Sequence, residues 1–473
     1  MIAAARAVPS AHAWVREDAL WMCAILLVAM ALRVAGAQGG LWLDEAWSAT
    51  LANDVGTPLG VFVSVNHDNN HHLNSLWLQF VGFDAAPPLT RALSIASGTL
   101  SVLVATLIAL PRGRGVAGVT ALLFAISPVL VTLGSEARGY APMALAFLVA
   151  VLIVDRSLTG TPVWRPRAAL ALAFGLGALS QLTIVFGISA IIGWYGSVMI
   201  ARVGLTDAVR ATMRLFAPAL TALAAVLGVI AAAAFFSPTG FTVGGYQPFD
   251  VMLFLHGVVE LLGFTVGLPM VSGWTIAVAL VLVVLARAAG ASRLALYRLA
   301  IVAFPLTLAL SQAGNVGHPR YYLVLGVALL LMLGEMIGQS FSTQGWRRWG
   351  AGGALATITM GSLAQDIDLI RNQRGDPSAA VRAIAERAAG GATVLLDRSS
   401  GEAMLTIAAA QQRYSLTITQ APCPAQRFLL VDRWRGEAMP PAPLRCGARY
   451  TPITAAEARG LSGTHWTLYE RAR

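Results

Sequence analysis

The chain has 473 residues, of which 57% are hydrophobic and only 12% are charged, and its mean hydropathy is +0.68. A soluble domain carries about 25% charged residues, and a compact core takes up apolar side chains only in proportion to its volume. The composition therefore excludes a soluble enzyme and predicts a chain that lies largely in lipid. The net charge of +10 comes from arginine alone, because the sequence contains no lysine. These arginines lie between apolar runs and near the C-terminus, a pattern typical of membrane topology rather than of a nucleic-acid-binding face.

Apolar runs long enough to cross a bilayer recur along the chain. A hydrocarbon core of about 30 Å needs about 20 residues of α-helix. We expect eleven spanning helices, near residues 19–37, 89–110, 115–134, 139–154, 168–182, 184–201, 215–236, 273–289, 299–314, 320–340 and 348–364. The sequence thus predicts a polytopic, all-α membrane domain over residues 1–364.

The arginines indicate how this domain is oriented. They gather before the first run and in alternate connecting segments, and cytoplasmic loops collect such residues. The N-terminus is therefore expected in the cytoplasm, and the long loop 38–88, which has no arginine, is expected outside. Residues 251–271 are apolar but would invert this order if they crossed. We expect them to lie along the outer interface, within an outer loop 237–272.

The composition changes after residue 364. Charged residues become frequent, and short β-branched or aromatic runs follow a helical segment at 377–389. The runs that we expect to form strands are 392–397, 413–419, 427–432 and 466–470. Residues 365–473 are therefore predicted to form a small extracytoplasmic α/β domain. Three cysteines are too few for a disulfide scaffold and lack the spacing of metal ligands, but Cys423 and Cys446 would be able to pair in an oxidising compartment.

The most informative motif follows the first apolar run. Asp44 and Glu45 are adjacent carboxylates flanked by Trp42 and Trp47. Two like charges in a partly dehydrated site raise each other's pKa, which favours a general base that accepts a proton from a hydroxyl. The alternative is structural: Asp44 would cap a helix, Glu45 would lie in its first turn, and the tryptophans would anchor the interface.

The same loop holds a second polar cluster with three open interpretations. His67, Asp68 and His71 would be able to bind a divalent cation, since His67 and His71 share a face if the segment is helical. Histidine and asparagine side chains also suit the hydroxyls of a sugar or an acceptor, and those predicted to do so are His67, Asn70, His71 and His72. The third interpretation is hydrogen bonding that is purely structural.

Two further polar clusters, at residues 135–140 and 317–322, fall on the same outer side. Their candidate substrate-binding residues are Glu136, Arg138, Tyr140, His318, Arg320 and Tyr321. Guanidinium groups at bilayer depth are suited to a lipid phosphate, and Arg91 is a weaker candidate for that contact. In the alternative, Glu136 pairs with Arg138 and Arg320 only extends to the interface.

Taken in order, the motifs resemble those of membrane glycosyltransferases of the GT-C fold. They are Asp44-Glu45-Ala46, Asn69-Asn70-His71-x-Leu73, Ser135-Glu136-Ala137-Arg138-x-Tyr140 and Pro319-Arg320-Tyr321. The resemblance is nearest to the family 39 and lipid A aminoarabinose-transferase relatives and covers about residues 20–340. Two departures are His72, where relatives often have proline, and the absence of lysine.

The resemblance implies a chemistry and a set of roles. It implies inverting transfer of a sugar from a polyprenyl-phosphate donor to an acceptor hydroxyl on the periplasmic side of a bacterial inner membrane. Asp44 would be the base with Glu45 as its neighbour, Glu136 and Arg138 would contact donor and acceptor, and Arg320 would bind the lipid phosphate. The partners would be the lipid-linked donor, an acceptor glycan, lipid or protein, and membrane lipids, without nucleic acid. No nucleotide site is needed, no cofactor is assigned, and a divalent cation stays open.

The rival class is a transporter or flippase of lipid-linked saccharides. It would also need many spans and charged groups within the membrane. Transporters usually carry internal repeats and helices broken at mid-membrane, and the sequence shows neither. The candidate residues also gather on one side, as a surface reaction requires.

Overall fold

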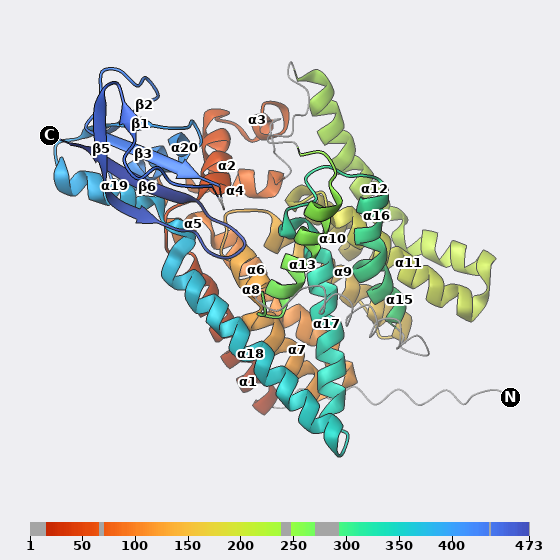
Figure 1. Ribbon diagram of the computed structural model, residues 1–473. Helices are drawn as coiled ribbons and strands as arrows, with labels where there is room; N and C mark the ends of the chain where they lie inside the picture. Colours follow the sequence, from red (N-terminus) through yellow and green to blue (C-terminus); the bar gives the residue numbers. More distant parts are fainter. Residues whose placement is uncertain (1–15, 66–70, 238–246, 270–292, 435–436, 473) are drawn as a thin grey trace.

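The computed structural model describes residues 16–65, 71–237, 247–269, 293–434 and 437–472. They form a bundle of apolar helices with a mixed α/β domain at one end (Figure 1). The span expected at 273–289 and parts of the expected loop 237–272 lie outside the described residues.

The long helices follow the apolar runs of the sequence. They are α1 (Arg16–Gly36), α6 (Ala92–Ala109), α7 (Arg114–Ile126), α8 (Pro128–Leu133), α9 (Tyr140–Thr159), α10 (Pro166–Ser180), α11 (Ile184–Val203), α12 (Leu205–Phe236), α13 (Val251–Thr265), α17 (Leu323–Ser340) and α18 (Trp346–Asn372). Another helical stretch consists of α15 (Leu294–Tyr297), a π-helical segment (Arg298–Ala303) and α16 (Phe304–Leu310). Short helices join α1 to α6, namely α2 (Leu43–Asp54), α3 (Pro58–Val63), α4 (His72–Val81) and α5 (Pro87–Thr90).

Six of the described helices are long and apolar enough to cross a membrane. They are Ala19–Gly36, Ala92–Arg112, Tyr140–Thr159, Ile184–Val203, Leu205–Phe236 and Pro319–Ser340. Four shorter apolar helices accompany them, so the chain is a multi-pass membrane protein. The expected total of eleven spans stays a prediction.

The helix boundaries differ from the expectation at two places, Ser127 and the segment 251–271. The expected span 115–134 is interrupted at Ser127, because Pro128 lacks an N–H and disfavours a helical conformation in the residue before it. The two helices expected at 168–182 and 184–201 are present as α10 and α11, which are separated around Gln181. The segment expected along the interface contains α13, whose C-terminal half is buried in the bundle.

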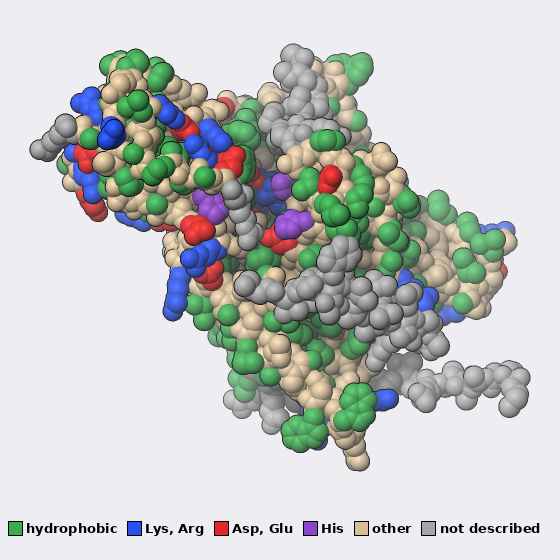
Figure 2. Space-filling model, in the orientation of Figure 1, with side chains coloured by type: hydrophobic (Ala, Val, Ile, Leu, Met, Phe, Trp, Pro, Cys, Tyr) green, Lys and Arg blue, Asp and Glu red, His purple; other side chains and the backbone are tan. Residues whose placement is uncertain are grey.

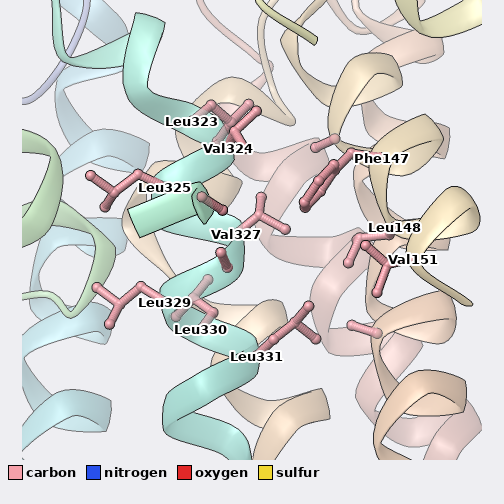
Figure 3. Packing of buried hydrophobic residues seen from close by; sticks show 14 of the residues in the cluster. Phe147, Leu148, Val151, Leu323, Val324, Leu325, Val327, Leu329, Leu330 and Leu331 are labelled. Carbon is pink, nitrogen blue, oxygen red and sulfur yellow. The ribbon is translucent and has the colours of Figure 1, made fainter. Parts of the chain in front are cut away.

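Helix α17 is the centre of the bundle. Of the 18 residues in its most apolar stretch 83% are buried, whereas the corresponding share is 17% for α12 at the periphery of the bundle. Val324 and Val327 of α17 lie on the side of that helix that faces Phe147 of α9 (Figure 3), and all three belong to one apolar cluster. The sides of the bundle are largely apolar, whereas charged side chains gather over the α/β domain (Figure 2).

The other end of the bundle carries a buried ion network. Arg293 donates to both carboxylate oxygens of Asp155 at 2.9 and 2.8 Å and to Glu335 at 2.5 Å. Arg112 reaches the same two carboxylates. Asp155 lies near the C-terminal end of α9, so this network is a helix length away from Tyr140. It ties together the ends of α6, α9 and α17.

A six-stranded sheet forms the core of the C-terminal α/β domain, in the order β2-β1-β3-β6-β5-β4. Its strands are β1 (Ala392–Leu396), β2 (Leu416–Thr419), β3 (Phe428–Arg433), β4 (Leu444–Arg445), β5 (Ala448–Ala456) and β6 (His465–Arg471). Strands β2, β1 and β3 are parallel, and β6, β5 and β4 continue the sheet in antiparallel pairs. Helices α19 (Pro377–Arg387) and α20 (Gly401–Gln411) share an apolar cluster with one face of the sheet.

The predicted α/β domain is present, with four strands near the expected positions. Strand β5 was missed because Pro452 interrupts its pattern, and the structure accommodates that proline with a register shift between Pro452 and Thr454. Position 365, the expected domain boundary, falls inside α18, which continues to Asn372. Where the domain boundary lies stays a prediction.

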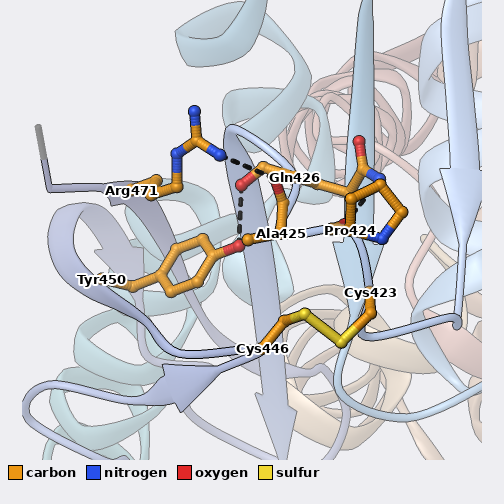
Figure 4. The surroundings of a disulfide bond; sticks show 7 residues. All are labelled: Cys423, Pro424, Ala425, Gln426, Cys446, Tyr450 and Arg471. Atoms are coloured by element: carbon orange, nitrogen blue, oxygen red, sulfur yellow. Dashed lines mark hydrogen bonds between the residues drawn. A yellow bond between two sulfur atoms is a disulfide. The ribbon is translucent and has the colours of Figure 1, made fainter.

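Cys423 and Cys446 form a disulfide in this domain (Figure 4). The bond joins the segment before β3 to the β4–β5 turn, and the two cysteines are 23 positions apart in the sequence. Replacing both cysteines with alanine should lower the stability of the C-terminal domain by about 2–4 kcal/mol, because the unfolded chain regains freedom. Thermal unfolding of the purified protein measures this loss, and alanine in place of the exposed Cys23 is the matched control. An unchanged unfolding temperature would contradict the prediction.

Candidate active site

Four stretches that are distant in sequence meet at the end of the bundle beneath the α/β domain. They are the start of α2, the start of α4, the turn between α8 and α9, and the short helix Pro319–Tyr322. Each stretch carries one of the motifs found in the sequence. The structure therefore brings together those motif residues that it describes, with each of the four motifs represented.

Glu45 is a fully paired structural carboxylate. It is 0% exposed, and Arg91 donates to its two oxygens at 2.8 and 2.5 Å. The backbone N–H groups of Ala137 and Trp42 donate to it as well, at 2.5 and 3.2 Å. These contacts outweigh the effect of burial and hold the pKa of Glu45 below its usual range, with Arg91 as the main cause. Glu45 therefore has no free oxygen lone pair with which to take a substrate proton.

Arg91 is equally occupied. Besides Glu45 it donates to the carbonyls of Ala37, Gly39 and Gly40, which form the connection between α1 and α2. The geometry thus favours a role in fixing the start of α2, and it leaves this guanidinium without a donor for a lipid phosphate.

Asp44 lies one residue earlier and faces a different set of groups. Its Oδ2 atom lies 2.7 Å from Arg320 and 3.4 Å from Arg138, and its side chain is 17% exposed. Burial by itself raises the pKa of Asp44. The electrostatic effect of Arg320, Arg138 and His318 lowers the pKa by more than burial raises it, so the net shift is downward. Asp44 is therefore an ionised carboxylate between two cations. It does not cap α2, since Trp42 occupies the N-cap position.

The two histidines at the start of α4 have different surroundings. His71 is buried, and its Nδ1 lies 3.0 Å from the carbonyl of Ser180, which accepts a hydrogen bond only from a protonated nitrogen. Burial keeps the pKa of His71 well below its usual range, so the ring is neutral and its Nε2 lone pair is free. His72 instead stacks on Phe62, with ring centroids 5.1 Å apart, and burial lowers its pKa to about 4.

Close packing fixes His71 in this position. A Cβ atom on Gly139 would lie 1.7 Å from the carbonyl oxygen of Ser180 and 2.8 Å from Nδ1 of His71. Only glycine permits this approach, which seats the α8–α9 turn against the end of α10. The ring of Tyr140 packs edge-on against that of His71, with the ring centroids 5.0 Å apart. The Cζ atom of Arg138 lies 6.0 Å from the centroid of the Tyr140 ring.

Glu136 is the third buried carboxylate of the site and is 0% exposed. Its Oε1 accepts a hydrogen bond of 2.5 Å from Ser462 and lies 3.5 Å from Arg374, both from the C-terminal part of the chain. Its Oε2 has no hydrogen-bond partner among the described residues. Burial is the main cause of a raised pKa, which Arg374 and Ser462 partly oppose. The sequence-based alternative that Glu136 pairs with Arg138 is wrong, because Arg138 pairs with Asp44.

The short helix Pro319–Tyr322 delivers the last predicted residues. Arg320 pairs with Asp44 and lies over the ring of Trp42, 5.7 Å from its centroid, so it is part of the site and not a surface anchor. His318 packs edge-on against Tyr321 at 5.5 Å, and burial lowers the pKa of His318 to about 4.

Gln181 and Thr183 were not singled out in the sequence. Gln181 is 0% exposed, and neither its amide nitrogen nor its amide oxygen has a partner among the described residues. The hydroxyl of Thr183 is unpartnered too. With Tyr321 and Tyr322 they line a cavity of about 180 Å³, far above the ~10–15 Å³ that one water needs. An interruption of the apolar run at 168–201 by Gln and Thr was the only sequence signal for them.

Other buried polar atoms of the site are also unpartnered in the described part of the chain. They are Nε2 of His71, Nε of Arg138, the hydroxyl of Tyr140 and Nε of Arg320. Buried polar groups are normally hydrogen-bonded, so such a concentration at one place is typical of a binding site for a polar ligand.

The metal site proposed from the sequence is not decided. His67, Asp68 and Asn70 lie outside the described residues, whereas His71 is bonded to Ser180. Within the ranges that the structure describes, no group of three or more His, Cys, Asp or Glu side chains has the arrangement of a metal site.

Comparison with known proteins supports the fold. No family model matches the chain, and no curated protein matches it in sequence. The structure is similar to ArnT from Cupriavidus metallidurans in the apo state, with a TM-score of 0.51 and 12% identity over 96% of this chain and 98% of that chain. It is similar to the same protein bound to undecaprenyl phosphate, with a TM-score of 0.52, 14% identity and the same coverage. The chain thus has the GT-C fold of membrane glycosyltransferases that its motifs predicted.

Proposed function

We propose that this protein transfers a sugar from a polyprenyl-phosphate donor to an acceptor hydroxyl, with Asp44 as the general base. The observation that carries the proposal is the position of Asp44, whose carboxylate lies between Arg138 and Arg320 at the meeting point of four motifs. The similarity to a protein whose structure holds undecaprenyl phosphate supports the choice of donor.

The two arginines are suited to the donor phosphate. Guanidinium groups bind phosphate oxygens through charge-assisted hydrogen bonds, and the Nε atoms of Arg138 and Arg320 have no partner within the described chain. A phosphate bound there would compete with Asp44 for both cations. Asp44 would then lose its strongest stabilising contacts, its pKa would rise, and it would become a better base when the donor is in place.

The reaction breaks one bond and forms another at the anomeric carbon. The acceptor oxygen attacks this carbon while its proton passes to Asp44, and the bond from the carbon to the phosphate oxygen breaks. Polyprenyl phosphate leaves with the electron pair, and Arg138 and Arg320 stabilise its added negative charge. Attack from the face opposite the leaving group inverts the anomeric configuration. The free Nε2 of His71 and the unpartnered amide of Gln181 supply hydrogen-bond partners for sugar hydroxyls.

The outer, periplasmic side of a bacterial inner membrane is the proposed location of this reaction. The arginine-rich segments 112–114, 156–167 and 202–214 lie where α6, α9 and α11 end, at the opposite end of the bundle from Asp44. Such segments are typical of cytoplasmic loops. A disulfide in the adjoining α/β domain fits an oxidising compartment on the other side.

Reconstituted protein tests the proposed function. Vesicles without any ion gradient are incubated with a polyprenyl-phosphate hexose and a panel of hydroxyl acceptors, and the free polyprenyl phosphate that forms is quantified. Release of polyprenyl phosphate together with a glycosylated acceptor supports a transferase. Movement of intact donor across the bilayer without its consumption would support a flippase instead.

Replacing Arg320 with Gln should weaken binding of polyprenyl phosphate about 10- to 100-fold, because one charge-assisted contact is lost. Titration of the purified protein with polyprenyl phosphate measures the affinity. The control is Arg210→Gln, which removes an exposed arginine that pairs with Asp207 on α12, at the opposite end of the bundle. Equal affinities in both variants would show that Arg320 does not contact the phosphate.

A further inference from the structure

We propose that the C-terminal α/β domain completes the active site, because Ser462 and Arg374 orient Glu136 so that one of its oxygens faces the substrate. The inference rests on the function proposed above and assigns positioning residues that no sequence motif marks. It makes the domain a working part of the catalytic centre and not an appendage.

Arg374 anchors the domain in the end of the bundle. It is 1% exposed and follows α18 with φ 59°, in the left-handed region that favours glycine. Its guanidinium donates to the carbonyl of Gly36 at 2.7 Å, to the carbonyl of Thr132 at 2.9 Å and to the hydroxyl of Ser135 at 2.7 Å. One side chain therefore joins the C-terminal ends of α1 and α8 to the start of the domain.

The same guanidinium connects to Glu136 through Ser462. Nε of Arg374 donates to the hydroxyl oxygen of Ser462 at 3.2 Å, and this hydroxyl donates to Oε1 of Glu136 at 2.5 Å. Ser462 lies in the connection between β5 and β6, 326 positions from Glu136 in the sequence. Oε1 is thus fixed from the domain side, which leaves Oε2 as the buried acceptor without a partner among the described residues.

The domain also supports the helix that carries Asp44. Ala403, Met404 and Ile407 of α20 share an apolar cluster with Trp42 and Ala46 at the start of α2. Oδ1 of Asp376 accepts a hydrogen bond from the backbone N–H of Gly40 at 2.8 Å. Both acidic stretches of the site are therefore in contact with residues of the C-terminal domain.

This arrangement gives Glu136 a role that matches its surroundings. The charged groups that face it are Arg374, Glu45 and Arg320, together with the hydroxyl of Ser462. With Oε1 held, Oε2 is directed to accept a hydrogen bond from a sugar or acceptor hydroxyl. Glu136 contacts substrate only as a carboxylate acceptor, so its ionised form is the working form.

The test compares Ser462→Ala and Ser462→Thr in the full-length protein. Loss of the hydroxyl should raise the pKa of Glu136 by about one to two units, because a hydrogen bond to the charged form disappears, whereas threonine should restore it. The titration midpoint is read from the carboxyl infrared band that is missing in Glu136→Gln. The acidic limb of the pH profile of kcat should move upward by the same amount, with a smaller change in KM for the donor. Arg374→Lys, which keeps the charge but loses the planar fork, provides a second variant with the same expected direction.

The matched control is Arg459→Gln, which changes an exposed arginine in the same connection that pairs with Asp368 of α18. Its midpoint and pH profile should equal those of the wild type. An unmoved midpoint in Ser462→Ala, or an equal shift in Arg459→Gln, would overturn the inference while wild-type sugar transfer continues to support the proposed function. If the wild type transfers no sugar although the midpoint moves in Ser462→Ala alone, the contact holds and the proposed function is rejected.

Discussion

Replacing Asp44 with Asn should reduce sugar transfer by about 10²- to 10⁴-fold, because the amide cannot accept the proton of the attacking hydroxyl. The substitution preserves the shape of the side chain. It also removes the anion that now occupies Arg138 and Arg320, so both cations become free for the donor phosphate. The affinity for polyprenyl phosphate should therefore be unchanged or higher. Single-turnover transfer and equilibrium binding, measured on the same preparation, separate the two effects.

The control for this prediction lies on the same helix. Asp54→Asn removes an exposed carboxylate at the C-terminal end of α2 and should leave both transfer and binding unchanged. Full transfer activity in Asp44→Asn would exclude Asp44 as the base. Loss of donor binding together with activity would assign it a structural role instead.

Replacing Arg91 with Met should destabilise the protein by about 3–5 kcal/mol, because the Glu45 charge would stay buried without its partner. The Arg91 and Glu45 side chains are 1% and 0% exposed, so water does not compensate for the lost contact. Three backbone carbonyls between α1 and α2 would lose their donor as well. Thermal unfolding in detergent, followed by the loss of helical circular dichroism, measures the effect.

Two further variants decide whether the loss comes from the unpaired charge. In Arg91→Met/Glu45→Leu both charges are absent, and part of the stability should return because no isolated carboxylate remains. Arg398→Met breaks an exposed pair with Glu437 and should leave the unfolding temperature nearly unchanged, because water already screens that pair. If Arg91→Met were as mild as Arg398→Met, the buried pair would not hold the start of α2.

The fate of the adjacent carboxylates shows where prediction from sequence ends. The motif Asp44-Glu45 predicts two acidic groups that raise each other's pKa, yet the structure separates them within a single helical turn. Glu45 faces Arg91 and Asp44 faces Arg138 and Arg320. Adjacent residues on a helix point in different directions, so the partners of each are set by the segments that pack on either side.

The sequence by itself determined the properties that depend on local pattern. Apolar run length predicted a multi-pass membrane protein, the motifs predicted the GT-C fold, and the shift in composition after residue 364 predicted the α/β domain. The membrane helices can be predicted in this way because the free energy of placing a helix in lipid is nearly additive along a segment.

Only the tertiary structure decided which charges and hydroxyls meet. The pairing of Glu136 with Ser462 spans 326 positions, and that of Glu45 with Arg91 spans 46. No periodicity links such residues, and an ion pair or hydrogen bond depends on distances of about 3 Å that exist only after the helices and the sheet have packed. The same holds for Gln181, whose amide is ordinary in the sequence and becomes informative only when burial leaves it unpaired.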